Sequence, residues 1–270
     1  MNLKKITIWA IILYASLIAF LFFFQRNLQY APMGQIKPIV DYNLEGFKEE
    51  KITTADKIKI LAWYRAPKKD EKIILFFHGN AGNLGDRSEK LNEFSKHNFG
   101  VLAISYRGYF GSEGVATQAG LITDVEAAFK FLLDRGYTPQ DIILYGESLG
   151  SGVATQLAAK FDFFAVILES PFSSVVGVAQ RKYWFAPVGL LLKDKFDSGN
   201  IANKISAPVL IFHGTDDPIV PFAEGKKLFD AIKSQKKFIE MQGAGHLGFD
   251  DEFLVGEERE FLREMKGEKE

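Results

Sequence analysis

The sequence predicts an α/β fold in which a mostly parallel sheet of eight strands is covered by helices on both faces. Three observations predict it. Short apolar runs, typical of strands buried on both faces, alternate with stretches of helical spacing. The connections between them are short, as in chains that join parallel strands through helices. The chain has 270 residues, 47% of them hydrophobic, which is enough for the core of one large domain.

The first two strands are expected to form an antiparallel hairpin over 47–54 and 58–65. Six buried strands are expected after this hairpin, at 73–77, 101–105, 142–145, 165–168, 208–212 and 237–241. The helices that alternate with them are expected over 86–97, 117–134, 148–160, 222–234 and 252–265.

One interval, 171–204, is longer than a plain crossover between two strands needs. Long insertions after strands are often lids or binding loops, and we expect a short helical lid here. Its apolar stretch is expected to line an acyl pocket or to touch a membrane surface. Tyr183, Trp184 and Phe185 are its candidate substrate-binding residues. The alternative is a helical crossover that packs onto the sheet.

The N-terminal segment Ile6–Phe24 is apolar and carries no formal charge. As a helix it spans roughly 28 Å, close to the hydrocarbon thickness of a bilayer. No small-residue cleavage site follows it, so an uncleaved, single-pass membrane anchor over 1–25 is favoured over a signal peptide or a buried core helix. Lys4 and Lys5 precede the segment, which indicates a cytoplasmic N-terminus and a domain on the outer side, periplasmic or lumenal.

Behind the anchor, residues 26–45 are expected to form an irregular connector, and 46–270 a single domain. The formal net charge of −1, with lysines scattered among acids, gives no basic patch for a nucleic-acid partner. Without cysteine the chain has no disulfide, thiol nucleophile or cysteine-bound metal, and its four histidines show no metal-binding spacing. Neither a metal nor an organic cofactor is expected.

Residues 146–150, Gly-Glu-Ser-Leu-Gly, have the G-x-S-x-G pattern of a nucleophile elbow. They follow an expected strand and precede an expected helix, which is the context that the elbow requires. Gly146 and Gly150 permit the sharp turn and the close approach of backbone. Ser148 is therefore predicted to be a nucleophile, which needs a histidine base oriented by a carboxylate.

Two later loops supply these partners. Asp217 follows the strand at 208–212, and it is preferred over Asp216 because it directly precedes the Pro-Ile-Val segment that leads to the next helix. His246 lies among small residues after the following strand. The chain order Ser, Asp, His is the order expected with a hydrolase elbow. The sequence thus predicts a triad of Ser148, His246 and Asp217.

The stretch HGNAGN at 78–83 also follows a buried strand. Its glycines allow backbone N–H groups to turn toward a developing oxyanion. We expect the oxyanion hole to be formed by the amides of Asn80 and Leu149, the latter directly after the nucleophile. The alternative of a phosphate-binding loop is disfavoured because the Walker and G-x-G-x-x-G spacings are missing. His78 is expected to stabilise the loop.

Five nearby residues are not expected to be catalytic. Tyr106 follows a strand and is a candidate for substrate contact. Arg107 and Asp124 are expected to brace loops, and Glu169 to hydrogen-bond a neighbouring loop. Glu147, inside the elbow, is expected either to tune the site or to face solvent or a loop.

The chain resembles the α/β-hydrolase superfamily over roughly positions 45–265, through LFFHGNAGN, SYRGYFGSEG, GLITD, YGESLG, LESPFSS, APVLIFHGTDDPIVP and GAGH. Within it, the chain is similar to the membrane-anchored branch that includes protein depalmitoylases and their bacterial relatives. The resemblance implies a serine hydrolase acting on acyl esters or thioesters, with Ser148, Asp217 and His246 in the family's catalytic positions. Depalmitoylases of this type carry an N-terminal cysteine cluster, which this chain lacks, so depalmitoylation itself is not carried over.

The sequence therefore predicts a membrane-anchored serine hydrolase that works through an acyl-enzyme on a small-molecule or lipid-like acyl substrate. A peptidase of the same fold is the first alternative, and a non-catalytic, membrane-tethered binding protein is the second. The natural substrate, the acyl chain length, the leaving group and the oligomeric state are left open.

Overall fold

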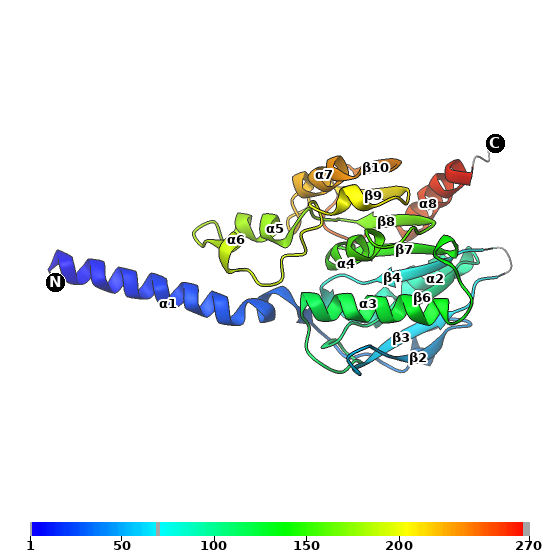
Figure 1. Cartoon of the computed structure of the whole chain (residues 1–270), viewed down its shortest axis with the longest axis horizontal. Coiled ribbons are helices and arrows are strands. Elements are labelled where there is room, and N and C mark those ends of the chain that lie inside the picture. The colour runs from blue at the N-terminus through cyan, green and yellow to red at the C-terminus, as the bar shows by residue number, and fades with distance from the viewer. Residues whose placement is uncertain (1, 69–70, 267–270) are drawn as a thin grey trace.

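The computed structural model describes residues 2–68 and 71–266 and is built around an eight-stranded sheet with the order β10-β9-β8-β7-β4-β6-β3-β2 (Figure 1). β3 is antiparallel to both β2 and β6, and the other neighbours are parallel. The expected mostly parallel sheet is thus confirmed. Its strands are β2 (Lys48–Thr53), β3 (Lys59–Arg65), β4 (Ile73–Phe77), β6 (Gly100–Ile104), β7 (Ile142–Glu147), β8 (Ala165–Glu169), β9 (Val209–Gly214) and β10 (Lys236–Met241).

Helices connect these strands as expected. The α-helices are α1 (Leu3–Gln29), α2 (Ser88–Lys96), α3 (Gln118–Leu133), α4 (Leu149–Ala158), α5 (Val175–Lys182), α6 (Val188–Leu191), α7 (Phe222–Ala231) and α8 (Asp251–Lys266). Short 3₁₀ turns are η1 (Ile39–Tyr42), η2 (Leu84–Arg87), η3 (Pro139–Asp141) and η4 (Ala202–Lys204).

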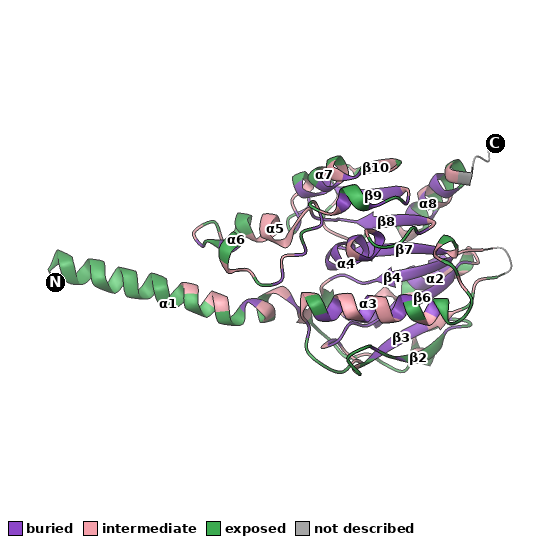
Figure 2. Ribbon diagram, in the orientation of Figure 1, coloured by how far each residue is buried: buried purple, intermediate pink, exposed green. Residues whose placement is uncertain are grey.

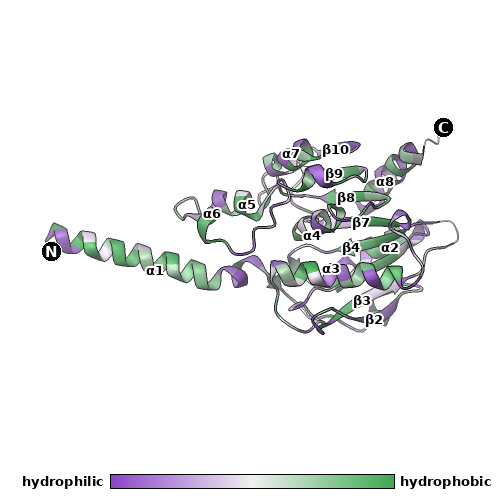
Figure 3. Cartoon of the chain, in the orientation of Figure 1, coloured by the Kyte–Doolittle hydropathy of each residue, from purple (hydrophilic) through white to green (hydrophobic). Residues whose placement is uncertain are grey.

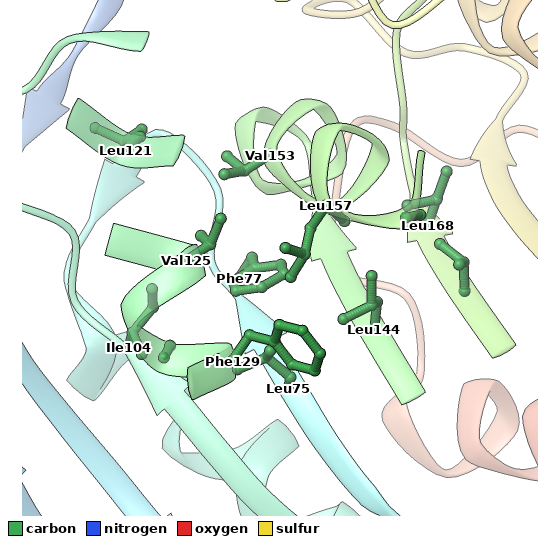
Figure 4. Packing of buried hydrophobic residues seen from close by; sticks show 14 of the residues in the cluster. Leu75, Phe77, Ile104, Leu121, Val125, Phe129, Leu144, Val153, Leu157 and Leu168 are labelled. Carbon is green, nitrogen blue, oxygen red and sulfur yellow. The ribbon is translucent and has the colours of Figure 1, made fainter. Parts of the chain in front are cut away.

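The sheet separates two apolar cores. Successive residues of a strand point to opposite faces, so Leu75 and Phe77 of β4 join one core while Ile74 and Phe76 join the other. Residues of α3, α4 and α7 complete the first core, part of which Figure 4 shows, and residues of α2 and α8 complete the second. The continuous apolar strands of the sequence have this cause, since both of their faces are covered.

Helix α1 extends away from the sheet (Figure 1) and has a mean hydropathy of 2.4 in its most apolar window, none of which is buried. Figures 2 and 3 show this helix as both exposed and apolar over most of its length. By length and composition it can cross a membrane. It continues to Gln29, four residues beyond the expected boundary at 25, and the side chains of Arg26 and Gln29 in this last turn bind Asp194 of the insert described below.

The connector 26–45 is more ordered than expected, because it contains the end of α1, η1 and a two-residue strand, β1 (Ala31–Pro32). β1 pairs in parallel with β5 (Ala81–Gly82) in the loop after β4. Asn83 in that loop also donates from Nδ2 to the carbonyl of Met33 at 3.1 Å. The connector is therefore fastened to the loop predicted to form the oxyanion hole.

Between β8 and β9, the insert over 171–204 contains α5, α6 and η4, so its helical content agrees with the expectation. In Figure 1, α5 and α6 lie on the same side of the sheet as α1. Phe172, at its start, packs over Gly152 of α4, where an added Cβ would lie 2.8 Å from the phenyl ring. The insert thus begins in contact with the helix that follows Ser148.

Candidate active site

Ser148 lies in the turn between β7 and α4, at the N-cap of α4, with φ 49° and ψ −110°. L-residues rarely adopt such a backbone, and the conformation costs about 1–3 kcal/mol. The two glycines allow it: a Cβ on Gly146 would lie 2.5 Å from the carbonyl oxygen of Gly150, and one on Gly150 would lie 2.0 Å from that of Phe77. The pattern of the sequence therefore produces the expected sharp turn.

The structure brings the three residues of the predicted triad together. His246 Nε2 lies 2.9 Å from Ser148 Oγ, and His246 Nδ1 lies 2.7 Å from Asp217 Oδ2. A carboxylate only accepts hydrogen bonds, so Nδ1 carries the proton and Nε2 is free to accept one from Ser148. This is the arrangement that a general base requires.

Asp217 is held by several donors. Its Oδ1 accepts the amides of Ile219 and Val220, each at 2.8 Å. Its Oδ2 also lies 3.4 Å from Nε2 of the buried His213. Burial alone would raise the pKa of Asp217, but the hydrogen bonds from His213 and His246 outweigh burial and lower that pKa below its ordinary value. The carboxyl group is therefore ionised at neutral pH.

Neighbouring loops place Asp217 and His246 side by side because β9 and β10 are adjacent and parallel. Gly214, at the end of β9, makes this possible, since a Cβ there would lie 2.1 Å from the carbonyl oxygen of Gly245. On the other side, the hydroxyl of Ser170 donates to the carbonyl of His246 and joins the histidine loop to the end of β8. Strand ends β7, β8, β9 and β10 thus meet at one edge of the sheet, as parallel strands do.

The loop after β4 lies beside the serine, since a Cβ on Gly79 would lie 3.6 Å from Ser148 Cβ. The next residue, Asn80, has its side-chain oxygen occupied by the amide of Ala31 at 3.0 Å and the hydroxyl of Tyr109 at 2.9 Å. Leu149 is the first residue of α4, a position whose amide has no acceptor within the helix. Leu149 directly follows Ser148, Asn80 directly follows the neighbouring Gly79, and the oxyanion hole formed by their amides stays a prediction.

His78 and Tyr106 support this loop. His78 is fully buried and its Nδ1 lies 2.6 Å from the carbonyl of Gly79. Burial, helped by the charge of Arg87, lowers the pKa of His78 to about 4, so the ring is neutral at pH 7. The expectation of substrate contact for Tyr106 is corrected: this side chain is fully buried and its hydroxyl donates to the His78 carbonyl at 3.0 Å.

A buried ion cluster that sequence reasoning missed lies beneath the elbow. Lys90 of α2 contacts Glu147 at 2.9 Å, Glu169, and Asp251 at 3.6 Å. Arg87 pairs with Glu147 at 3.2 Å. Burial opposes the charge of Lys90, but the surrounding carboxylates outweigh it and raise the pKa of the lysine. No pattern marked Lys90, because a lysine in an amphipathic helix is usually solvated.

The other polar expectations can be placed as well. Arg107 binds Asp124 through Nε at 2.9 Å and Asp56 through Nη1 at 2.6 Å, so it joins helix α3 to the hairpin corner. Bracing by Arg107 and Asp124 is thus confirmed. Glu147 lies within the ion cluster and faces neither solvent nor the hydroxyl of Ser148.

Of the three aromatic candidates of the insert, Phe185 contacts α1. The carbonyl of Phe185 accepts a hydrogen bond from Tyr14 Oη at 2.8 Å, and Trp184 is 77% exposed. Neither observation places Tyr183, Trp184 or Phe185 around Ser148. A hollow of about 520 Å³ lies elsewhere, between β2 and α3, with Ile52 and Phe131 in its lining.

Comparison with known proteins supports the architecture. A family model described as the alpha/beta hydrolase fold matches residues 72–194, and one described as serine aminopeptidase matches 197–252. Human alpha/beta hydrolase domain-containing protein 17B is 35% identical over 198 residues, which cover 71% of this chain and 65% of that protein. An uncharacterised protein of Mycobacterium tuberculosis is 31% identical over 264 residues, which cover 95% of this chain and 93% of that protein.

Solved structures share the fold at low sequence identity. An esterase of Pyrococcus furiosus has a TM-score of 0.69 and 20% identity, with 88% of this chain and 97% of that chain covered. A puromycin-hydrolyzing peptidase of Mycobacterium tuberculosis has a TM-score of 0.70 and 19% identity, with 86% and 41% covered. The fold and these matches define a hydrolase. The chain belongs to the α/β-hydrolase superfamily.

Proposed function

We propose that the protein is a membrane-anchored serine hydrolase that cleaves acyl ester or thioester bonds through an acyl-enzyme. One observation carries the proposal: a continuous chain of hydrogen bonds links Ser148, His246 and Asp217, with the serine on a strained elbow. A strained backbone and an oriented base recur where a hydroxyl group must act as a nucleophile. The structurally similar esterase and the hydrolase-domain relatives agree with this reaction class.

In the proposed first half-reaction, Ser148 Oγ attacks the acyl carbonyl while its proton passes to His246 Nε2. Asp217 keeps the imidazole in the required tautomer and stabilises the imidazolium that forms. The carbonyl oxygen becomes an oxyanion, to which the amides of Asn80 and Leu149 donate. His246 then gives its proton to the leaving alcohol or thiol, and the acyl group remains on Ser148.

In the second half-reaction, water enters and His246 removes its proton as the oxygen attacks the acyl-enzyme. The second tetrahedral intermediate collapses, Ser148 Oγ recovers its proton from His246, and the carboxylic acid leaves. The positive end of α4, which begins at Leu149, favours the oxyanion in both halves.

Helix α1 is proposed to be the membrane anchor. It is long and apolar enough to cross a bilayer, and no residue of its most apolar window is buried. Lys4 and Lys5 at its start favour a cytoplasmic N-terminus, with the hydrolase domain on the outer side. Protease added to sealed vesicles that carry the protein in their membrane tests this orientation. The protease should digest the hydrolase domain only where that domain faces the outside of the vesicle.

A serine peptidase is the second candidate, because residues 197–252, which contain Asp217 and His246, match a model described as serine aminopeptidase. The two candidates share the nucleophile and differ in the leaving group. Purified full-length protein assayed on matched series of acyl esters, acyl thioesters and aminoacyl amides separates them. We expect kcat/KM to be largest for the esters or thioesters, and preference for the amides would favour the peptidase.

Replacing Ser148 with alanine tests the mechanism itself. Ser148→Ala should reduce ester turnover to background while the protein stays folded, because the only side-chain hydrogen bond described for the Ser148 hydroxyl is the one that it donates to His246 Nε2. Ser206→Ala, at an exposed serine, is the matched control and should retain wild-type turnover. Wild-type-like activity of folded Ser148→Ala would falsify the proposal.

A further inference from the structure

The insert between β8 and β9 is fastened to the end of α1. Arg26 binds Asp194 through Nε at 2.8 Å and Nη2 at 3.3 Å, and Gln29 Nε2 donates to the carbonyl of Asp194 at 2.8 Å. Asp194 is buried, so this ion pair is shielded on one side from water. The insert between β8 and β9 is thereby joined to α1, the helix at the N-terminal end of the chain.

The contact continues along α1. Gln25 donates from Nε2 to the carbonyl of Leu191 at 3.2 Å and accepts the amide of Lys193 at 2.7 Å. Further toward the N-terminus, the hydroxyl of Tyr14 donates to the carbonyl of Phe185 at 2.8 Å. From Tyr14 to Arg26 the helix rises about 18 Å, so the insert accompanies α1 over that distance.

This length decides where the insert lies relative to a membrane. The part of α1 on the N-terminal side of Tyr14, residues 3–13, rises only about 16 Å, whereas a hydrocarbon core is about 30 Å thick. The apolar segment can therefore span a bilayer only if the bilayer also surrounds the stretch that the insert contacts. A membrane that holds α1 in this arrangement must also hold the tip of the insert.

The chemistry of residues 183–192, the tip of the insert, fits a lipid environment. Trp184 is 77% exposed and Leu190 is 85% exposed. Tyr14 and Gln25 supply donors to the insert carbonyls of Phe185 and Leu191, and backbone carbonyls need such partners where water is absent. Polar side chains of one membrane segment commonly hydrogen-bond another in this way.

Charged residues flank this apolar tip. Arg181 and Lys182 precede it, and Lys193 and Lys195 follow it. The single acid within 181–196, Asp194, is neutralised by Arg26. Long cationic side chains can extend from an apolar surface to lipid headgroups, and anionic headgroups attract them.

We propose that residues 183–192 form a membrane-embedded segment that lies in the same bilayer as α1 and occupies its acyl-chain region. The inference rests on the proposed anchor and extends it toward the site: Ser170, the residue directly before the insert, donates its hydroxyl to the carbonyl of His246. The insert thus joins the histidine loop to the lipid phase. Acyl esters dissolved in a bilayer would then reach the site along the insert, without passing through water.

Tryptophan fluorescence tests the position of the insert independently of activity. The chain has three tryptophans: Trp9 on α1, the fully buried Trp63, and Trp184. Full-length Trp9→Phe protein is placed in vesicles of phosphatidylcholine and phosphatidylglycerol in equal parts, with or without bromine on the acyl chains. Bromine quenches only tryptophans that it can approach, so we expect a clear loss of emission from Trp184.

Two matched variants identify the source of that loss. Trp9→Phe/Trp184→Phe should show no loss, because Trp63 lies in the domain core, and Trp184→Phe alone reports on Trp9 and therefore on the anchor. If Trp9 is quenched and Trp184 is not, the anchor stands and the embedded insert is overturned. Protection of Trp184 from both bromine and aqueous acrylamide would indicate a second protein copy and would also overturn it. If neither tryptophan is quenched, the anchor and the insert both fail, while Ser148→Ala still tests the hydrolase.

A charge at the tip gives a second readout. Leu190→Glu should lower turnover of a long-chain ester carried in the same vesicles severalfold and leave turnover of a water-soluble short-chain ester unchanged. Leu133→Glu makes the same change at a part-exposed leucine at the end of α3 and should affect neither substrate. Equal turnover of the vesicle-borne ester by Leu190→Glu and Leu133→Glu contradicts the proposal.

Discussion

The backbone of Ser148 is held from two sides. Its amide donates to the carbonyl of Glu169 at 2.9 Å, and its own carbonyl accepts the amide of Ser151 at 2.9 Å. These bonds maintain a φ of 49° that costs about 1–3 kcal/mol in a non-glycine residue. Strand β8 and helix α4 therefore hold Ser148 in its strained backbone conformation, and the Ser148 hydroxyl stays within hydrogen-bonding distance of His246.

Asp217 acts on the serine only through His246 in the proposed mechanism. Asp217→Asn should lower kcat by about 10³–10⁴-fold and change KM little, because an amide can hold the wrong imidazole tautomer and does not stabilise the imidazolium. The neighbouring Asp216 is exposed, so Asp216→Asn is the matched control and should be close to wild type. Steady-state kinetics on one soluble ester compare the two, and equal losses would contradict the assignment of Asp217.

The lowered pKa of His78 predicts that the free energy of unfolding depends on pH. Its pKa is lowered to about 4 in the folded chain, whereas an unfolded histidine titrates near 6.5. Between these values the unfolded state binds more protons, so the free energy of unfolding rises with pH from about 4 to 6.5 and then levels off. The contribution is on the order of 3 kcal/mol.

Urea unfolding of the full chain in detergent, followed at several pH values, measures this slope. His78→Asn keeps a side-chain donor near the Gly79 carbonyl but does not titrate, so its stability should change less between pH 5 and 6.5 than that of the wild type. An unchanged slope in His78→Asn would show that another group causes the dependence.

At the scale of elements, the turn from β7 into α4 depends on close backbone contact with β4. A Cβ on Gly150 would lie 2.0 Å from the carbonyl oxygen of Phe77 and 2.9 Å from that of His78. Helix α4 can begin directly after the nucleophile only because this residue has no side chain. The glycine of the motif therefore has a packing cause that is visible only in three dimensions.

Gly150→Ala should destabilise the protein by about 1–3 kcal/mol or more and abolish turnover, because the helix must shift away from β4. Gly256→Ala is the matched control: it lies within α8, nothing in the described part of the chain beyond its own helix lies within 4 Å of the added Cβ, and the change should stabilise by about 0.5–1 kcal/mol. Denaturant unfolding of both variants checks the pair. Equal effects would show that the contact with Phe77 is relaxed in solution.

Several elements were predicted from the sequence to within two residues, because apolar runs and helical spacing state how each segment is buried. The end of strand β7 is an instructive example of the remaining difference, because the strand continues to Glu147, two residues past its expected end at 145. The extension pairs Gly146 with Leu168 and Glu147 with Glu169 of β8. Pairing with a neighbouring strand, and not local pattern, sets the point at which a strand ends.

At the scale of the whole molecule, the ion cluster around Lys90 joins four elements that are distant in the chain. The lysine is on α2, Glu147 on β7, Glu169 on β8 and Asp251 at the start of α8. Asp251 follows His246 by five residues, so the cluster also fixes the end of the histidine loop. Two core layers and the elbow are thereby connected through one buried cation.

Lys90→Met should therefore destabilise the protein by about 3–5 kcal/mol, because it leaves Glu169 buried without its cation and Glu147 with Arg87 alone. Lys233→Met removes an exposed lysine and should change stability by less than about 0.5 kcal/mol. The two free energies of unfolding are compared at pH 7. A loss in Lys90→Met no larger than in Lys233→Met would show that the carboxyl groups become neutral at little cost.

The sequence by itself determined the class of the fold, the elbow at Ser148 and the identity of its two partners, because burial pattern and chain order are local or one-dimensional properties. It also marked α1 as an apolar segment and 171–204 as an insert. Only the tertiary structure decided that Tyr106 supports a loop, that Lys90 lies beneath the elbow, and that the insert follows α1 from Arg26 to Tyr14. These depend on contacts between residues far apart in the chain, for which a single sequence carries no periodic or positional signal.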